Sequence, residues 1–565
     1  MDAHASEALF SFPSGTGSGH TSPLHSVRLF FMHRRDFLKL SSLAGLSACS
    51  ERLPWQNPPV TVLRPGMELG HLLRDKLPVA PPSRTRECEL AILGSGIAGL
   101  TAAWRLARES FKDFCLLTGP EPFGNAAGSR LGEVPCPRGA HYLPLPTPEA
   151  AHIREMLASL DILQGDPGAL KPVYDERAIV HAPEERLLIN GRWQEGLMPR
   201  EGLDAEVRAQ IERFSREMTR LRDLKGADGR RAFAIPITAS SRDPALRALD
   251  GLRFSAWLDR EGYKAPALRA WLDYCCRDDY GAGCEQVSAW AGLHYFASRG
   301  GQAANAEEGA VLTWPDGLNP LARALSESLP PACRQAGMAL RVSRRGKGVE
   351  VLCVGPDGRE AFTLRAKRVI LAMPLHVAMH VVEGFSDFGF VRERDLPESA
   401  SWLISNFLLK GFPREREPQD QSAWDNVVQG SAGLGWVVAT HQWIRQAKPE
   451  RTVFTAYRAL AHQSPKIARA WMLSAGAGEL LDLAATDLLA AYGRDFWKGV
   501  EHVEITLRGH AMASPTPGFL SRLGIEALRE ADGPLLFAHA DLSGLSIFEE
   551  AAWWGEAAAR KILSA

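Results

Sequence analysis

The sequence predicts an α/β fold, in which a doubly wound Rossmann-like domain is built from separate segments and interleaved with an α+β domain. Three features lead to this prediction: a glycine turn between an apolar strand and a helix, strands with alternating polarity in mid-chain, and a closing strand and helix. The 565 residues, 45% of them hydrophobic, suffice for two or three cores, since one core stops growing at about 250–300 residues. A net charge of -1 gives no general attraction to nucleic acid, and we expect none as a partner.

The glycine turn carries the strongest single motif. Gly94, Gly96 and Gly99 form GxGxxG directly after the apolar run ELAIL and at the start of the helical pattern IAGLTAAWRLA. In this motif the first glycine permits a tight turn, the second lets a pyrophosphate approach, and the third allows close helix packing. Ile97 and Ala98 fall in the first helical turn, where backbone amides favour a phosphate. We therefore expect a dinucleotide here.

The next strand, DFCLLTG, departs from the dinucleotide pattern. An acidic residue about 20 positions after the glycines normally holds the ribose hydroxyls. Thr118 stands there in this chain, and Glu121 follows it closely. A threonine hydroxyl makes a weaker contact than a carboxylate. This difference concerns the ribose contact, for which Glu121 could supply the carboxylate instead. The prediction of a dinucleotide is unaffected.

Three separated stretches resemble flavin-containing amine oxidases and their relatives. PFGNAAGSR with PRGAHYLPLP resembles their GG-x-R region and flavin-side loop, and the closing stretch GPLLFAHADLSGLSIFEEAAWWGEAAARKIL resembles their final FAD motif. Between them, VLTWPDGLNPLARAL, the hairpin-like strands around GPDG and KRVILAMP follow the family order. The resemblance implies FAD rather than NAD as the cofactor. It also implies a non-covalent flavin, because SGLSIFEE has no cysteine at the attachment position.

This resemblance defines the expected segments and cofactor contacts. The FAD-binding domain would comprise residues 85–144, 301–375 and 506–565, and the substrate domain residues 145–300 and 376–505. The residues expected to hold FAD are Gly94, Gly96, Ile97, Ala98, Gly99, Thr118, Asn125, Arg130, Gly139, Ala140, Asp541 and Glu549.

The first part of the chain has a different composition. Arg34 and Arg35 precede a weakly apolar run that ends at Cys49, the layout of a secretory signal. The stretch resembles a twin-arginine signal with a lipoprotein box, which implies twin-arginine export machinery as a partner, a periplasmic location and a candidate lipid anchor at Cys49. The alternative is a chance arginine pair before an amphipathic helix. Met32 stands just before the signal and is a candidate start.

On this interpretation residues 1–49 are an export signal, and the proline-rich residues 50–84 form an extended tether. A protein that binds FAD before export suits the twin-arginine route, which carries folded passengers. No uncharged apolar run reaches the roughly 18 residues of a membrane-spanning helix.

Four residues are the candidates for a position beside the flavin ring. His141 and Tyr142 lie in the loop that the resemblance places near the flavin, and His510 lies just before the closing segment. Asn406, or Ser405 beside it, stands where many amine oxidases carry a lysine. A structural, hydrogen-bonded histidine is the alternative for both histidines. No metal is expected, because the cysteines lack a paired CxxC pattern.

Other polar groups in apolar surroundings leave two interpretations open. The adjacent Asp278 and Asp279 are either solvated or capping groups, or they face a substrate. Asp425, Asn426 and His441 stand in strand-like segments, where an unpaired polar group costs about 1–3 kcal/mol. They are therefore either paired with each other or line a wet cavity.

Three functions fit this sequence. The first is an FAD-dependent oxidoreductase that removes a hydride from the C–N bond of a small amine-type substrate. The second is a flavin-dependent desaturase or isomerase with an apolar substrate, which the absent lysine favours. The third is a non-catalytic FAD-binding protein, which the altered Thr118 leaves open.

Overall fold

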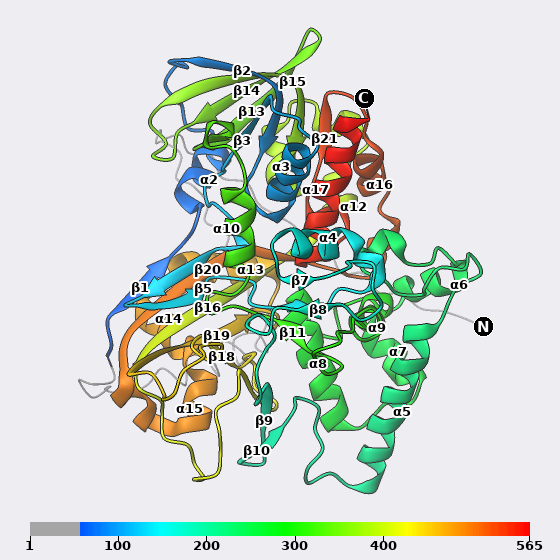
Figure 1. The fold of residues 1–565 in the computed structure, drawn as a ribbon, viewed down its shortest axis with the longest axis vertical. Helices are drawn as coiled ribbons and strands as arrows, with labels where there is room; N and C mark the ends of the chain where they lie inside the picture. Colours follow the sequence, from blue (N-terminus) through cyan, green and yellow to red (C-terminus); the bar gives the residue numbers. More distant parts are fainter. Residues whose placement is uncertain (1–56, 565) are drawn as a thin grey trace, which may run out of the picture. The chain divides into compact units, whose positions relative to one another are not determined.

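Two mixed sheets organise residues 57–564, the part of the chain that this computed structural model describes (Figure 1). Met32, Arg34, Arg35 and Cys49 lie outside the described residues, as does the whole expected export signal. Among the residues that are described, no helix combines the length and hydrophobicity that crossing a bilayer requires.

The first sheet is the expected Rossmann-like sheet, and the predicted α/β class is confirmed. Parallel pairing runs through its centre, and the meander β13–β14–β15 adds antiparallel strands. In sheet order the strands are β12 (Arg334–Gln335), β3 (Phe114–Leu117), β2 (Thr85–Leu93), β15 (Ala361–Leu371), β14 (Gly348–Val354) and β13 (Met338–Arg345), with β21 (Leu535–Phe537) also on β15. The last four residues of β2 are buried, as expected for a parallel strand covered on both faces.

Helices α3 (Ile97–Arg108) and α17 (Phe548–Leu563) pack directly on each other beside this sheet (Figure 1). Their approach is so close that a Cβ at Gly555 would lie 2.2 Å from the Ala98 carbonyl oxygen. Glycine at that position in α17 thus brings the last helix against the first turn of α3. The last helix of the described chain thus meets the glycine motif.

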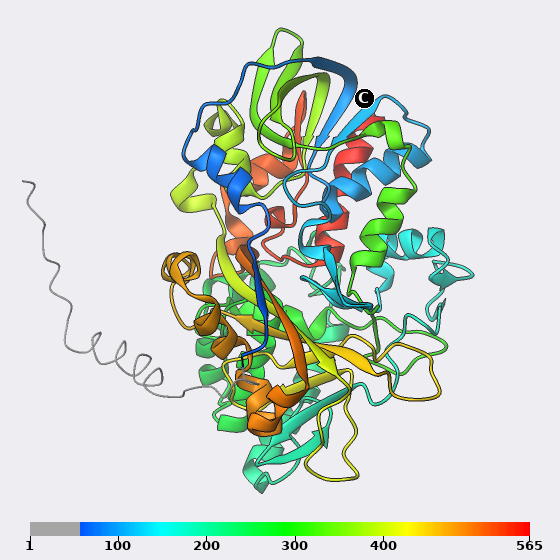
Figure 2. The same cartoon turned by 90° about the vertical axis from the view of Figure 1, so that its left-hand side faces the viewer.

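The second sheet has eight strands. Their order is β1 (Val60–Leu63), β20 (Val500–Ser514), β16 (Glu398–Lys410), β19 (Arg451–Ala459), β18 (Trp436–Val438), β17 (Asp425–Val428), β9 (Glu185–Ile189) and β10 (Arg192–Glu195). The long strands β16 and β20 pair antiparallel along most of their length and extend toward the Rossmann-like sheet (Figure 2). β20 is one continuous strand of this sheet, so it crosses the domain boundary expected at residue 506.

The expected tether is structured in its described part. It contains β1, which runs parallel to β20, and α2 (Met67–Arg74). Val60 and Val62 pack against the core beneath the second sheet, which explains why this proline-rich stretch forms an edge strand.

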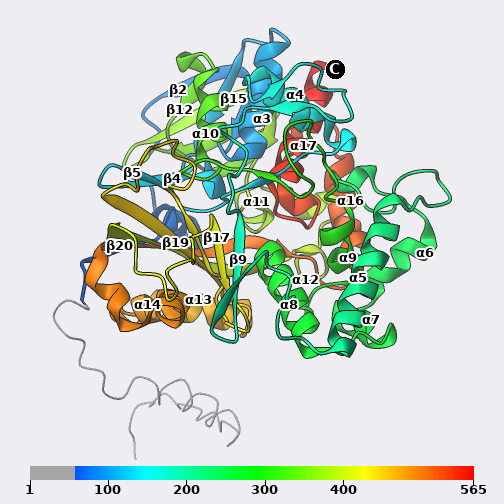
Figure 3. The same ribbon diagram turned by 60° about the horizontal axis from the view of Figure 1, so that its bottom comes forward.

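Helices cover both faces of the second sheet. On one face, α13 (Pro465–Ser474), α14 (Ala477–Ala484) and α15 (Thr486–Tyr492) share a core with β16 and β19. On the other side lie α5 (Ala205–Asp223), α7 (Phe254–Arg260), α8 (Pro266–Tyr280) and α9 (Ala289–Ala297), which have their own core (Figure 3). A further apolar cluster lies between α8 and the sheet, and it contains Tyr274, Trp424 and Tyr457.

Shorter elements complete the described chain. The remaining helices are α4 (Ala151–Ser159), α6 (Pro244–Arg247), α10 (Asn319–Glu327), α11 (Leu375–Val381), α12 (Arg392–Asp395) and α16 (Leu523–Glu530). The remaining strands are β4 (Gly128–Leu131), β5 (Val134–Pro137), β6 (Leu143–Pro144), β7 (Leu163–Gln164), β8 (Val173–Tyr174) and β11 (Val311–Leu312).

Candidate functional site

The glycine motif forms a turn that the surrounding backbone locks in place. Gly94 has φ of +120°, and a Cβ there would lie 2.3 Å from the Ala372 carbonyl oxygen. A Cβ at Gly99 would lie 1.8 Å from the Gly94 carbonyl oxygen. Neither position can carry a side chain without moving backbone, so these two glycines are required by the protein's own packing.

Gly96 is different, because a Cβ there would meet no protein atom within 4 Å. Gly96 is the N-cap of α3, and no side chain caps the helix. The first amides of a helix have no partner within it and favour an anion. Ile97 and Ala98, in the first turn, are buried. A space that a Cβ would enter, in front of uncapped amides, fits the pyrophosphate of FAD.

The loop after β3 lies beside this turn but contributes no free carboxylate. The Thr118 hydroxyl donates to the Gly119 carbonyl oxygen (3.2 Å) and accepts from the Gly337 amide (3.4 Å). The Glu121 carboxylate is held by the Arg508 guanidinium in a two-pronged ion pair of 2.8 and 3.0 Å. Glu121 is therefore engaged by β20, and Thr118 is the side chain left for the ribose end.

Two backbone contacts lead from the glycine turn into the interior. A Cβ built on Gly124 would lie 3.7 Å from the Gly96 Cα, so the two glycines lie side by side. One residue further, the Asn125 carbonyl oxygen accepts from the Ala140 amide (2.8 Å), and a Cβ at Gly139 would lie 2.1 Å from the same oxygen. Ala140 is exposed, although Gly139 beside it is buried.

Asn125 itself contributes its backbone to this path. Its side-chain amide donates to the Ala511 carbonyl oxygen (2.6 Å) and so ties the loop to β20. Arg130 lies further out, on a cavity of about 440 Å³ that Ser129, Asn319 and Arg323 also line. Its guanidinium donates to the Glu133 carbonyl oxygen (2.9 Å) and is otherwise exposed.

The closing segment brings two of the expected acids to the interior. The Asp541 carboxylate accepts from the Leu375 amide (2.9 Å) at the start of α11 and lies 3.3 Å from the His539 ring. Burial alone would raise the pKa of Asp541, but His539 and the Leu375 amide outweigh it and lower the pKa to about 2. Glu549 is buried at the start of α17, and this burial raises its pKa to about 7.

His141 and Tyr142 belong to a group of four aromatic rings that the structure brings together from three segments. The His141 ring stacks on Tyr457 with centroids 4.3 Å apart, and it lies 5.8 Å from the ring of Trp424. Tyr142 meets Trp424 edge-on at 6.2 Å. The Tyr457 hydroxyl donates to the Gly139 carbonyl oxygen (3.0 Å), which attaches the aromatic group to the end of the backbone path.

The surroundings of His141 set its charge. Burial lowers its pKa to about 3, so the imidazole is neutral at physiological pH. His141 and Tyr142 nevertheless keep some exposed surface, so they border internal space rather than solid core. Sequence reasoning missed Trp424 and Tyr457, because both are apolar positions of strand-like segments and nothing local separates them from ordinary core.

Two other candidates lie apart from this group. Asn406 is completely buried: its side chain donates to the Pro137 carbonyl oxygen (3.0 Å) and accepts from the Thr455 hydroxyl (2.7 Å). Through these contacts Asn406 holds β16, β19 and the end of β5 together. His510 is exposed near the end of β20, where its ring stacks on His376 with centroids 4.1 Å apart.

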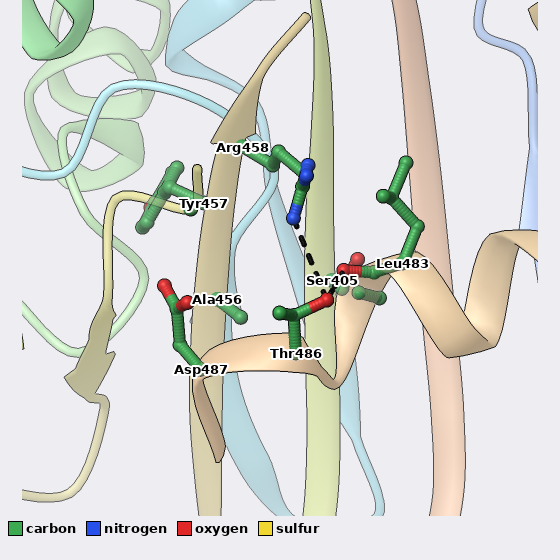
Figure 4. Close-up of a pocket in the computed structure, with 9 residues that line it drawn as sticks. Ser405, Ala456, Tyr457, Arg458, Leu483, Thr486 and Asp487 are labelled. Carbon is green, nitrogen blue, oxygen red and sulfur yellow. Dashed lines mark hydrogen bonds between the residues drawn. The ribbon is translucent and has the colours of Figure 1, made fainter. Parts of the chain in front are cut away.

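A second small pocket lies on the opposite face of β19. Arg458, Thr486 and Asp487 line it, and the Arg458 guanidinium donates to the Thr486 hydroxyl at 3.5 Å (Figure 4). Tyr457 points the other way, toward the aromatic group. The pocket beside α15 is thus separated by the sheet from the path that starts at Gly96. Among the described residues, no group of three or more His, Cys, Asp or Glu side chains is arranged to hold a metal ion.

Comparison with known proteins agrees with this architecture. The model of an NAD(P)-binding Rossmann-like domain matches residues 92–160, which include the glycine motif and the path to Ala140. No protein with curated function matches the sequence significantly.

Solved structures with a similar fold include two named as oxidases and one named as a fatty acid isomerase. Putrescine oxidase, solved with putrescine bound, is 17% identical with a TM-score of 0.61 over 85% of this chain and all of that one. Cyclohexylamine oxidase from Brevibacterium oxydans IH-35A is 15% identical, with a TM-score of 0.56 over 85% of this chain and 99% of that one. A fatty acid isomerase from P. acnes is 15% identical, with a TM-score of 0.52 over 83% and 97%. At these identities the likeness establishes a shared fold, and the reactions of these neighbours differ.

Proposed function

We propose that this protein is an FAD-dependent oxidoreductase that removes a hydride from the carbon of a C–N bond in a small amine-type substrate. The observation that carries the proposal is the continuous path from the open, uncapped turn at Gly96, through Asn125 and Ala140, to the aromatic rings of His141 and Tyr457. A dinucleotide whose pyrophosphate lies at Gly96 would extend along this path toward His141 and Tyr457. Two of the structural neighbours carry the names of amine oxidases.

The residues that would hold FAD are those of the path. The amides at the start of α3 would meet the pyrophosphate, Thr118 would lie toward the ribose, and the Gly139–Ala140 backbone would lie along the flavin end. When bound, FAD supplies a two-electron acceptor. The substrate would lose a hydride from carbon and a proton from nitrogen, so that its C–N bond becomes C=N.

The chain's own groups suit such a substrate. The neutral His141 imidazole does not repel a cation and can accept a hydrogen bond from an N–H group. The faces of Tyr142, Trp424 and Tyr457 attract ammonium groups through their ring quadrupoles. Together they would orient the substrate and exclude water from the reacting bond.

An absorption experiment tests this proposal. The protein is purified in full, its flavin bands are recorded, and butylamine, putrescine, cyclohexylamine or butanol is added without oxygen. Bleaching by an amine, and none by butanol, is the expected result. Flavin bands that persist with every amine would contradict amine oxidation, and a protein that binds no flavin even after FAD is added would contradict the cofactor.

We also propose that the protein is exported with its cofactor, on the strength of Arg34, Arg35 and Cys49 in the sequence. The double substitution Arg34→Lys and Arg35→Lys should leave the protein in the cytoplasm. Unchanged export of this variant would contradict the proposal.

A further inference from the structure

Two carboxyl groups from distant parts of the chain meet beside the aromatic rings. Asp278 lies in the last turn of α8, and Asp425 is the first residue of β17. The Tyr142 hydroxyl donates to Asp278 Oδ2 at 3.4 Å. Asp278 also lies close enough to Asp425 to raise its pKa further, beyond the effect of burial. The side chain of Asp425 is buried, with 9% of the residue's surface exposed.

Neither carboxyl group forms an ion pair with a basic residue of the described chain. Arg299 partly offsets the raised pKa of Asp278, but its ion pair is with Asp279. Arg277 is on the same helix, but its guanidinium is engaged by Asp273 and by backbone carbonyls around Ala432. Arg299 and Arg277 therefore act on Asp278 only from a distance, and no basic side chain of the described residues contacts either carboxyl group.

A third carboxyl group, that of Glu185, lies next to this pair. In the register of β17 with β9, Glu185 stands opposite Asp425, and burial raises the pKa of Glu185 to about 6. Burial likewise raises the pKa of Asp278 to about 7. Buried carboxyl groups without a cationic partner either keep a proton or take up a cation, because a buried charge without a counter-charge is costly. The cluster is thus prepared for a positive charge that the protein does not supply.

Aromatic rings surround the same space. Tyr274 lies one turn before Asp278 on α8, and burial raises its pKa, with the carboxyl group of Asp425 adding to the effect. Tyr295 and Tyr142 keep partial exposure, so they border internal space. Carboxylates combined with the faces of aromatic rings are the usual means of binding an organic ammonium group. Acids alone would fit an inorganic cation or a bound proton equally well.

The acids suit a nitrogen that is not the one oxidised. The reacting nitrogen must be neutral when its carbon loses a hydride, whereas a neighbouring carboxylate favours the protonated, charged form. The oxidised bond would lie nearer the neutral His141 and the Gly139–Ala140 backbone, with the Tyr142 ring between His141 and Asp278.

We propose that the substrate is an aliphatic diamine or polyamine, and that Asp278 and Asp425 bind its second, charged nitrogen while the first is oxidised. This inference rests on the proposed function, which supplies the redox step. It assigns specificity to two acids that lie 147 positions apart in the sequence (425 − 278).

Binding of matched amines tests the inference. Putrescine and butylamine share a four-carbon chain and differ in the second ammonium group. The flavin-loaded, full-length protein is titrated anaerobically with each amine at pH 8, by calorimetry and by perturbation of the flavin spectrum. We expect putrescine to bind at least about tenfold more tightly than butylamine. Asp278→Asn and Asp425→Asn should each remove most of that preference, because putrescine binding should weaken far more than butylamine binding.

Asp161→Asn is the matched control, because Asp161 is exposed and its left-handed backbone accepts asparagine. It should retain the preference for putrescine. Equal affinities of the wild type for the two amines would overturn the inference, and this result needs no variant to fold. Variants that weaken both amines equally would overturn it as well.

The outcomes separate this inference from the proposed function. Preferential, carboxyl-dependent binding of putrescine without flavin reduction would support the diamine site and contradict the oxidase proposal. Flavin reduction by butylamine and putrescine alike, independent of Asp278 and Asp425, would support the oxidase proposal and overturn the diamine site.

Discussion

The dinucleotide turn at Gly94 to Gly99 and the aromatic–acid site are built by opposite means. The aromatic–acid site is the group formed by His141, Tyr142, Trp424, Tyr457, Asp278 and Asp425. At the turn, backbone does almost everything: Gly94 and Gly99 are held by carbonyl oxygens, and Gly96 leaves a space in front of bare amides. At the aromatic–acid site, side chains from separate segments converge, including Tyr142 and Asp278. An added side-chain atom at the turn would disturb either the fold or the bound dinucleotide, whereas the aromatic–acid site depends on charge and pH. Substitutions should therefore fail in different ways in the two regions.

The largest effect is expected from Gly99→Ala. The new Cβ would lie 1.8 Å from the Gly94 carbonyl oxygen, so the turn must shift against α3. Overpacking of this severity should cost about 3 kcal/mol or more of unfolding free energy and abolish flavin binding. Thermal unfolding and flavin content measure both effects. Gly478→Ala in α14 is the control, because a Cβ there meets nothing within 4 Å. Equal stability of both variants would contradict the tight turn.

Gly96→Ala should separate ligand binding from folding. Its Cβ meets no protein atom within 4 Å, so the apo-protein should be as stable as the wild type. The methyl group would enter the space assigned to the pyrophosphate, and the Kd for FAD should rise by about 100-fold, or about 2.7 kcal/mol. Titration of the apo-protein with FAD measures this change. Unchanged affinity would place the cofactor elsewhere.

These two glycines also show why the turn could be predicted from the sequence. The motif, its strand and its helix are contiguous, so local spacing specifies the geometry of Gly94, Gly96 and Gly99. The Rossmann-like class followed from a similar local pattern, whereas the association of the closing helix with it was implied by the family resemblance. The pairing of β1 with β20 was not predictable in the same way, because proline-rich composition hides a four-residue edge strand.

The aromatic–acid site depends on contacts that no local pattern encodes. Asp278 could be read as a solvated or capping residue until α8 was placed against β17. Trp424 and Tyr457 are ordinary core residues in sequence and become a binding surface only because β17, β18 and β19 align them with His141. Asn406 shows the reverse case, since its polar side chain in an apolar strand has structural partners.

Glu549→Gln tests how the stability of the folded protein depends on pH. Glu549 is 3% exposed, and burial raises its pKa from the ordinary value near 4.3 to about 7. Between these values the folded protein binds a proton that the unfolded chain has lost, so stability falls as pH rises from about 4.5 to 7. Glutamine removes this loss, which amounts to about 3–4 kcal/mol, so the Tm of the variant should fall less than that of the wild type between pH 5 and pH 8.

The same variant shows whether Glu549 touches the cofactor, as the family resemblance implies. Retained flavin with an altered pH profile would assign Glu549 to stability alone. Loss of flavin at neutral pH would assign it to FAD binding instead. Parallel curves of Tm against pH for Glu549→Gln, the wild type and the exposed control Asp161→Asn would contradict the raised pKa.

The smallest effect is expected from Asn406→Ala, which addresses a residue between the two regions. The substitution leaves the Pro137 carbonyl and the Thr455 hydroxyl without their buried partner, at a cost of about 1–3 kcal/mol in stability. Because Asn406 has no exposed surface, kcat and KM for an amine should stay within about twofold of the wild type. Thr455→Ala breaks the same hydrogen bond from the other side, so the double variant should lose less stability than the sum of the single ones. A tenfold or greater fall in kcat with flavin retained would instead make Asn406 a catalytic residue, and the aromatic–acid site would then extend through β16 to the position where related enzymes carry a lysine.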